Sequence, residues 1–380
     1  MDFTFTPEQI AWRDRARRLA EDVVLPRAVE VDETAEYPWD IQRAMAQAGL
    51  SGLNIPKEYG GAGADLTTLC LVGMEINRAC ASSGAILAAQ VLGSFPLVLA
   101  GTPEQKATYL PGLAAGETQM AFALTERGAG SDPASMTTTA MRDGADWIVS
   151  GDKCFVGNGG PSDLYVVFAR TDPEACARGI SAFLVEKRTP GVAVGKAEKK
   201  MGIRGTVTSE LHFRDVRVPA ANLLGEPGNG LRLALATLDL ARPTCAAQAL
   251  GIAQAAFEEA VAYARQRRQF GQRIADFEAI QFMLADMATQ LEAGKLLLLK
   301  TCALHDAGER RITAEAAMCK LFCSEAAKFI VDRCVQIHGG YGYCGGHNAE
   351  RHYRDQRITE IYEGTSEIQR LVIARHILAD

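Results

Sequence analysis

The spacing of hydrophobic positions changes twice along this chain of 380 residues. Residues from about Pro7 to Gly116 show the wide apolar spacing of helices, broken by glycine-containing loops. Near Thr118 the spacing shortens to alternation, and after Gly228 it becomes helical again. The pattern predicts an α+β protein with helices over 1–117, an antiparallel β domain over 118–227 and a helical bundle over 228–380.

The first helix has a clear predicted start. Thr6 can cap it, Pro7 suits its first position and Glu8 falls in its first turn. Further along, Gly61-Ala-Gly63 is not a dinucleotide fingerprint, because no strand precedes it and a third glycine is absent. We expect that segment to be a connecting loop.

The middle domain contains short segments with strand character. Turn signals at Asp143-Gly144, Asn158-Gly-Gly160 and Pro190-Gly191 separate several of them. The strand candidates are Met120–Leu124, Trp147–Val149, Leu164–Phe168, Ala182–Val185 and Glu210–Phe213.

Two long apolar stripes follow in the third domain, and each repeats at helical spacing. They comprise Leu250, Ala253, Phe257 and Ala264, then Ile280, Leu284, Met287, Leu291 and Leu298. We interpret both stripes as core or subunit packing.

Composition excludes several classes of protein. Hydrophobic residues make up 48% and charged residues 23%, which is ordinary for a globular protein. The net charge of −6 provides no basic surface for nucleic acid. We see no apolar run long enough to span a membrane and no signal-peptide pattern at the start, so we expect a cytoplasmic protein.

The ten cysteines suggest neither a disulfide framework nor a metal site. No CxxC pair occurs, and Cys319 and Cys323 lack further Cys or His ligands at zinc-binding spacing. Free buried thiols are the simpler interpretation. His338, beside Gly339-Gly340, is interpreted as a packing or hydrogen-bonding residue, and no metal ligand is predicted.

Glu363 is the strongest candidate for chemistry. Ser366 and Gln369 fit a capping box, which predicts the start of the last helix and places Glu363 on the loop that enters it. A carboxylate on such a loop can reach a ligand and remove a proton. The simpler alternative is a glutamate that only interacts with the helix dipole.

Several long motifs favour the catalytic interpretation. They are Ala123-Leu-Thr-Glu-Arg-Gly-Ala-Gly-Ser-Asp132, Tyr263-Ala-Arg-Gln-Arg-Arg-Gln-Phe-Gly271, Ile337-His-Gly-Gly-Tyr-Gly342 and Ile361-Tyr-Glu-Gly-Thr-Ser-Glu-Ile368. In this order, they resemble the acyl-CoA dehydrogenase family over nearly the whole chain, from Phe5 to the last helix.

The resemblance implies FAD as cofactor, an acyl-CoA thioester as substrate, an electron-transfer flavoprotein as acceptor and a homotetramer. The implied reaction is α,β-dehydrogenation, in which a base takes the α-proton and flavin N5 accepts the β-hydride. A redox cofactor is chemically necessary because no side chain accepts hydride well.

Glu363 matches the family's base. Some members carry the base on the helix that here contains Leu238–Arg242, but the corresponding residue is Ala241, which cannot accept a proton. A helix N-terminus lowers a carboxyl pKa and burial raises it. We expect burial to prevail only with substrate bound. The family also uses the base's own N–H and a flavin ribityl hydroxyl to stabilise the thioester enolate.

The resemblance also implies which residues bind the two ligands. The expected FAD contacts are Phe122, Leu124, Thr125, Gly130, Ser131, Phe155, Val156, Gly157, Arg267, Phe270, Phe277, Gln336, Gly339, Gly340, Thr365 and Glu367. Arg267 is assigned to the pyrophosphate of the FAD in an adjacent subunit. The expected substrate contacts are Ser131, Asp239, Arg242, Tyr362 and Gly364.

Four features depart from the usual family pattern. Arg127 replaces a proline, and Phe155 stands where many members have tryptophan. Gly157 replaces a threonine or serine whose hydroxyl contacts flavin N5. Cys344-Gly-Gly-His-Asn348 differs from the usual proline-containing loop. The aromatic replacement also occurs in isobutyryl-type members.

Two other functions remain open. A flavin-dependent acyl-CoA oxidase would pass electrons to oxygen, which the sequence cannot reveal. A non-catalytic flavin-binding relative that protects DNA would have a basic surface and a disrupted acyl-CoA site. The acidic charge and Glu363 disfavour that second alternative.

Overall fold

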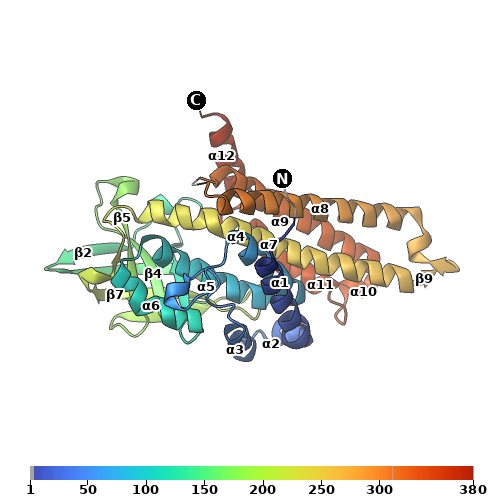
Figure 1. Ribbon diagram of the computed structural model, residues 1–380, viewed down its shortest axis with the longest axis horizontal. Helices are drawn as coiled ribbons and strands as arrows, with labels where there is room; N and C mark the ends of the chain where they lie inside the picture. Colours follow the sequence, from blue (N-terminus) through green and yellow to red (C-terminus); the bar gives the residue numbers. More distant parts are fainter. Residues whose placement is uncertain (1–3, 310, 380) are drawn as a thin grey trace.

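The β domain and a protruding hairpin lie at opposite ends of the long axis of the molecule. A computed structural model describes residues 4–309 and 311–379. Figure 1 shows strands at one end of an elongated molecule and the hairpin of β9 (Arg268–Gln269) at the other end. Helices α7 (Gly230–Gln266), α8 (Glu278–Asp306) and α9 (Thr313–His338) run lengthwise between them.

The amino-terminal part is helical, as predicted. Thr6 caps the first helix in a capping box with Gln9, and Pro7 is its first residue, so the predicted start is confirmed. Gly61 and Gly63 lie in the loop that leads to α4. The main helices are α1 (Pro7–Leu19), α2 (Ala28–Thr34), α3 (Trp39–Gln47), α4 (Leu66–Ala79), α5 (Ala81–Ala100) and α6 (Pro103–Ala115).

Helix α5 corrects the expectation that no segment could span a membrane. By length and composition alone it could do so, because its mean hydropathy is 1.7 over an 18-residue window. However, 67% of that window is buried inside the protein. Tertiary packing therefore accounts for its apolar composition, and such a helix alone is weak evidence for a membrane span.

The middle part forms one mixed sheet in the order β6-β7-β3-β2-β4-β5-β8, with β1 added against β4. Its pairings are antiparallel except that β1 and β2 each pair parallel with β4. The strands are β1 (Met120–Ala123), β2 (Thr139–Asp143), β3 (Asp146–Gly157), β4 (Leu164–Arg170), β5 (Ile180–Glu186), β6 (Val192–Ala197), β7 (Thr208–Val218) and β8 (Leu223–Leu224).

Four of the five predicted strand segments lie wholly in strands, and the fifth extends one residue past β1, to Leu124. Strands β2, β6 and β8 were not predicted. Strand β6 has no buried residue, and β2 has one, so neither shows the apolar run that identifies the central strands. Strand β8 is only two residues long.

The chain becomes helical again after Asn229, with three long helices followed by three shorter ones. They are α7 (Gly230–Gln266), α8 (Glu278–Asp306), α9 (Thr313–His338), α10 (Gly340–Tyr343), α11 (Ala349–Gln356) and α12 (Ser366–Ile377). The hairpin of β9 (Arg268–Gln269) and β10 (Gln272–Arg273) joins α7 to α8. Leu250, Met287 and Leu298 are buried, as the two stripes predicted.

One continuous core joins the terminal helical parts, because buried residues of α1, α4, α5, α7, α8 and α9 pack together. Polar contacts attach the segments around this core. Arg354 pairs with Asp32 at 2.5 Å, and Asp355 accepts a hydrogen bond from the Ile203 backbone at 2.5 Å. The last helices therefore contact both the first helices and the β domain.

Candidate active site

Glu363 lies on the short segment before α12 with a left-handed backbone, φ +55°. Helix α12 begins at Ser366 as predicted, but the cap is Thr365, whose hydroxyl accepts from the Ile368 N–H at 3.3 Å. Gln369 instead donates to the carbonyls of Glu363 and Gly364, at 3.0 and 2.9 Å. The predicted Ser366 capping box is therefore wrong by one residue, and Gln369 supports the loop.

The Glu363 carboxyl has a raised pKa and an unpaired oxygen, both of which favour accepting a proton. Burial raises its pKa to about 7, against the opposing effects of Lys320 and Arg242. Its Oε2 atom is buried without a hydrogen-bond partner in the described chain. The residue as a whole is half-buried, but its Oε2 atom is buried in the chain alone. Burial therefore raises the pKa without a bound substrate, contrary to our expectation that burial would prevail only beneath one.

Lys320 is a site residue that the sequence analysis missed. This fully buried lysine of α9 donates from Nζ to the Gly364 carbonyl at 2.8 Å. Burial lowers its pKa, while Cys245 and Glu363 act in the opposite direction. A lysine between apolar and cysteine positions of a buried helix was the available signal, since a buried lysine needs a partner.

The predicted substrate residues on α7 form a polar cluster around the buried Arg242. Arg242 Nη1 lies 2.6 Å from Asp239 Oδ1, and Thr313 donates to Asp239 Oδ2 at 2.6 Å. Ala241 is buried beside them and carries no base. Tyr362 donates to the Gln248 side chain, and Arg242 contributes to the electrostatics at Glu363. The fold thus brings Asp239, Arg242, Tyr362 and Gly364 around Glu363.

A buried ion pair holds the glycine-rich segment after β1. Lys153 Nζ lies 2.8 Å from Glu126 Oε1 and donates to the Leu124 carbonyl at 3.0 Å. Glu126 also accepts from the N–H groups of Thr137 and Thr138, at 2.6 and 3.0 Å. Replacement of proline by Arg127 therefore leaves the segment anchored. The sequence analysis missed both members of this ion pair.

The surface beside this segment is open and partly apolar. Phe155 on β3 is 64% exposed and has φ +54°, an unusual conformation for an aromatic residue. A side chain at Gly130 would meet nothing within 4 Å. Thr125 and Phe122 are half-buried, Ser131 is exposed, and Leu124 and Val156 are buried. Exposed aromatic surface beside accessible backbone suits a planar ring with polar substituents.

Most of the other predicted FAD residues gather at the opposite end of α7, whereas Thr365 and Glu367 lie at the start of α12 beside Glu363. Arg267 follows that helix, with its guanidinium 5.5 Å from the Tyr341 ring centre. Phe270 at the tip of the β9–β10 hairpin is 94% exposed and lies 6.1 Å from Phe277. Gln336, Gly339 and Gly340, where α9 ends and α10 begins, are also exposed.

The two groups lie in different parts of a single chain, one in the β domain near the start of α7 and the other beyond the end of α7 (Figure 1). Helix α7 has 37 residues, which corresponds to about 55 Å at about 1.5 Å per residue. The residues of each group are chemically suitable for part of the cofactor. The exposed Phe155 ring and the accessible backbone at Gly130 belong to the first group, whereas the Arg267 guanidinium belongs to the second. FAD therefore fits if two chains each supply one group.

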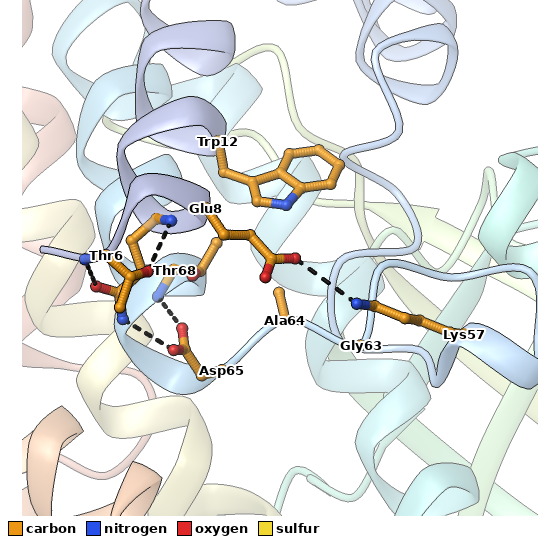
Figure 2. Close-up of a pocket in the computed structure, with 9 residues that line it drawn as sticks. Thr6, Glu8, Trp12, Lys57, Gly63, Ala64, Asp65 and Thr68 are labelled. Carbon is orange, nitrogen blue, oxygen red and sulfur yellow. Dashed lines mark hydrogen bonds and ion pairs between the residues drawn. The ribbon is translucent and has the colours of Figure 1, made fainter.

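A separate polar pocket lies between the start of α1 and the loop before α4 (Figure 2). Gln9 donates to Asp65 at 2.8 Å, and Lys57 pairs with Glu8 at 3.7 Å. Asp65 also caps α4 through the Thr68 N–H. Its charged groups already have partners, which indicates a role in helix docking.

Family profiles match almost the whole chain. "Acyl-CoA dehydrogenase, N-terminal domain" matches residues 6–117, the middle domain matches 121–216 and the C-terminal domain matches 228–378. The chain belongs to the acyl-CoA dehydrogenase family. It is therefore an FAD-containing oxidoreductase that acts on acyl-CoA by dehydrogenase-type chemistry.

Curated relatives share nearly half of their residues with this acyl-CoA dehydrogenase family member. "Probable acyl-CoA dehydrogenase fadE25" of Mycobacterium bovis is 46% identical over 99% of this chain and 97% of its own length. "Acryloyl-CoA reductase (NADH)" of Anaerotignum propionicum is also 46% identical, over 100% of this chain and 96% of its own.

Solved structures share the fold. Butyryl-CoA dehydrogenase from Megasphaera elsdenii has a TM-score of 0.97 and 39% identity, with 100% of both chains covered. Acyl-CoA dehydrogenase complexed with FAD from Bacillus anthracis has a TM-score of 0.92 and 35% identity, covering 98% of this chain and 67% of the other. The predicted family, fold class and cofactor are thus confirmed.

Proposed function

We propose that this protein converts a short or branched acyl-CoA thioester to the 2-enoyl-CoA, with Glu363 as the base. The observation that carries the proposal is the buried, unpaired Oε2 of Glu363 on a carboxyl with a pKa of about 7. A base with a pKa near the working pH is both available and strong enough to take a proton.

The backbone N–H of Glu363 has a second role in the proposed reaction. Its N–H donates no hydrogen bond within residues 4–309 and 311–379, so it is free to donate to the thioester carbonyl. Such donation stabilises the negative charge that develops on this oxygen as the α-proton moves to Glu363. Bound FAD supplies the acceptor for the hydride that leaves the β-carbon.

Lys320 and Arg242 are positioning residues for this base. Both cations lower the pKa of Glu363 against the effect of burial, and Lys320 also holds the Gly364 carbonyl. Without them the carboxyl would be protonated over a wider pH range and would be a less available base.

We further propose a homotetramer in which neighbouring chains complete each FAD site, and an electron-transfer flavoprotein as electron acceptor. The separation of the two residue groups supports shared sites. The exposed Phe270, Phe282 and Leu296 near the hairpin and along α8 support an interface there, because large exposed apolar surfaces commonly mark contacts.

The reverse reaction is a second candidate. The relative named acryloyl-CoA reductase (NADH), which matches over the whole of this chain, motivates it. In that direction protonated Glu363 would return a proton to the α-carbon. Initial rates should be compared for saturated thioester with an artificial electron acceptor and for enoyl thioester with NADH and electron-transfer flavoprotein.

Replacement of Glu363 by Gln tests the proposed base. Glu363→Gln should retain FAD but reduce the flavin about 10²–10⁴-fold more slowly when mixed anaerobically with acyl-CoA, because it keeps the shape and loses the base. The matched control is Glu360→Gln, which removes a nearby carboxylate paired with Arg357 at 3.1 Å. Reduction of the Glu363 variant at the parent rate would assign proton removal to another residue.

Oxygen consumption tests the oxidase alternative. The proposed dehydrogenase should turn over acyl-CoA slowly in air and rapidly with an added electron acceptor. Equal rates without the acceptor would identify an oxidase.

A further inference from the structure

Three potential metal ligands meet at the end of the helical bundle that is remote from Glu363. Glu259 lies on α7, His338 is the last residue of α9, and His347 lies between α10 and α11. One ligand atom from each lies within 4.8 Å of the other two. The fold joins these residues although they belong to three separate segments.

His338 presents an unused acceptor. Its Nδ1 lies 2.8 Å from the Cys334 carbonyl, which can only accept, so Nδ1 carries the proton and Nε2 keeps a lone pair. Nε2 has no hydrogen-bond partner in the described chain, although the residue is only 3% exposed. Tyr263 stacks on the ring at 4.2 Å and limits its rotation. A buried acceptor without a partner is costly, so Nε2 is well suited to coordinate a ligand.

Glu259 contributes a carboxylate with one oxygen that makes no hydrogen bond within the described residues. Its Oε1 accepts from the Asn348 N–H at 3.2 Å, and its Oε2 is buried without a hydrogen bond. His352 Nε2 lies 3.4 Å from Oε2. His338 thus has a supporting contact and a free Nε2 atom, and Glu259 is held through Oε1 while its Oε2 has only the contact with His352.

We propose that Glu259, His338 and His347 bind one divalent transition-metal ion of the zinc class. Two imidazole nitrogens and one carboxylate oxygen form a known three-residue zinc set, with water in the fourth position. The Cys334 carbonyl holds His338 in the orientation that such ligands require. This site is distinct from the proposed base and was not predicted, because its ligands do not form a short sequence motif.

Binding requires a small closure of the cluster. Bonds of about 2.0–2.2 Å at tetrahedral angles place ligand atoms about 3.4 Å apart, so the 4.8 Å limit leaves about 1.4 Å to close. His347 is the ligand expected to move on binding. It follows Gly345 and Gly346, and a Cβ atom added at either glycine would meet nothing within 4 Å. His338 is held by packing and Glu259 by the Asn348 N–H.

The ion would connect three elements that otherwise meet through few polar contacts. It would join α7, the end of α9 and the segment before α11. Tyr341 lies beside His347, with ring centres 5.8 Å apart, and also beneath the Arg267 guanidinium. Metal binding would therefore stabilise the region that presents Arg267.

Zinc binding to the FAD-containing protein tests the proposal. After chelator treatment and dialysis, titration with Zn²⁺ in competition with a chromophoric chelator should show one tight site per chain and a higher Tm. His347→Ala and Glu259→Gln should each lower Zn²⁺ affinity about 100-fold or more, since even supporting contacts contribute about 10–100-fold. Circular dichroism and FAD content check the folding of each variant.

His212→Asn is the matched control. That histidine also lies beside carboxylates, with Asp152 at 2.5 Å, but Asp152 is already paired with Arg214. This variant should keep the tight zinc site. Absence of one-to-one zinc binding in the parent, or equal affinity in His347→Ala, would overturn the proposal. Loss of FAD from metal-free His347→Ala would also overturn it, by assigning the cluster to a flavin phosphate.

Discussion

At the residue scale, the proposed chemistry depends on how one carboxyl is buried. Glu363 lies at the start of a helix, where the dipole favours a charged carboxylate. Its pKa nevertheless rises to about 7, because burial outweighs the dipole and the two nearby cations. The same glutamate on an exposed helix start would be ionised throughout the physiological range.

The raised pKa of Glu363 predicts a pH dependence. The base is active when ionised, so kcat/KM should increase with pH through about 7 and then level off. Lys320→Met should move this midpoint to higher pH, because it removes the cation that lowers the pKa of Glu363 most. Stopped-flow measurement of flavin reduction from pH 5.5 to 9 would check both, and a midpoint unchanged by the substitution would contradict the assigned role of Lys320.

Whereas activity should rise with pH, the stability of the native state should fall over the same range. The folded pKa of Glu363 exceeds its unfolded value, so the native state loses stability as pH rises from about 4 to about 7. Glu363→Gln removes that cost and should stabilise the protein at pH 8 by about 1–3 kcal/mol, with no gain near pH 4. Denaturant unfolding at the two pH values would measure the difference. An equal effect at both would exclude a titration origin.

Gly157 provides a prediction about substrate choice. A side chain here would meet only Ala89, at 3.8 Å, so the position tolerates a larger residue. Gly157→Thr should restore the hydroxyl usual in the family but occupy space beside the flavin. We expect kcat/KM to fall about tenfold for branched relative to straight-chain thioesters, since a lost methyl-sized space costs about 1–3 kcal/mol. An unchanged ratio would reject a specificity role.

At the scale of elements, the flavin segment depends on the Glu126–Lys153 ion pair. Burial raises the pKa of Glu126, but Lys153 and the hydrogen bonds from Thr138 and Thr137 together lower it to about 2. The stabilisation is therefore complete above the unfolded pKa near 4.5 and is lost as pH falls toward 2. This pair connects β3 to the segment after β1.

Lys153→Met should destabilise the protein by about 3–5 kcal/mol and weaken FAD binding, because it leaves Glu126 buried without its cation. Arg127→Ala is the control. Its side chain is 84% exposed and pairs with Glu210 at 2.5 Å, so we expect a change of no more than about 1 kcal/mol. Denaturant unfolding and retained FAD measure both variants. Equal losses would show that the buried pair has no special role.

At the scale of the whole molecule, α7 separates the two halves of the proposed flavin site. The β domain, which contains the glycine-rich segment, lies near one end of this helix, and the β9 hairpin lies at the other (Figure 1). Arg267 directly follows the helix at the hairpin end. In the proposed tetramer a neighbouring chain completes each site and would cover Phe270, which is exposed in the single chain.

Arg267→Ala should lower FAD affinity about tenfold or more, since a hydrogen bond to a charged group contributes about 1.5–3 kcal/mol. It should also weaken the oligomer. Arg265→Ala, which removes an exposed arginine from the same end of α7, is the matched control. FAD content after dialysis and mass in solution would check the prediction. Unchanged values in Arg267→Ala would make this residue an ordinary surface arginine.

The sequence was sufficient where a local pattern determines a structure. Helical spacing predicted the stripes of α7 and α8, and Thr6 with Pro7 predicted the start of α1. The motifs identified the family, and with it the fold class and FAD. Strands β2 and β6 were missed because they bury little apolar surface and so lack the central strands' pattern.

Only tertiary structure determined the environment of the charged groups. Burial, rather than position on a helix, sets the pKa of Glu363, and Lys320 reaches its loop from another helix. Glu126 meets Lys153, and Glu259 meets His338, across long stretches of chain. Such contacts leave no local spacing in the sequence, because the fold brings their partners together from separate elements.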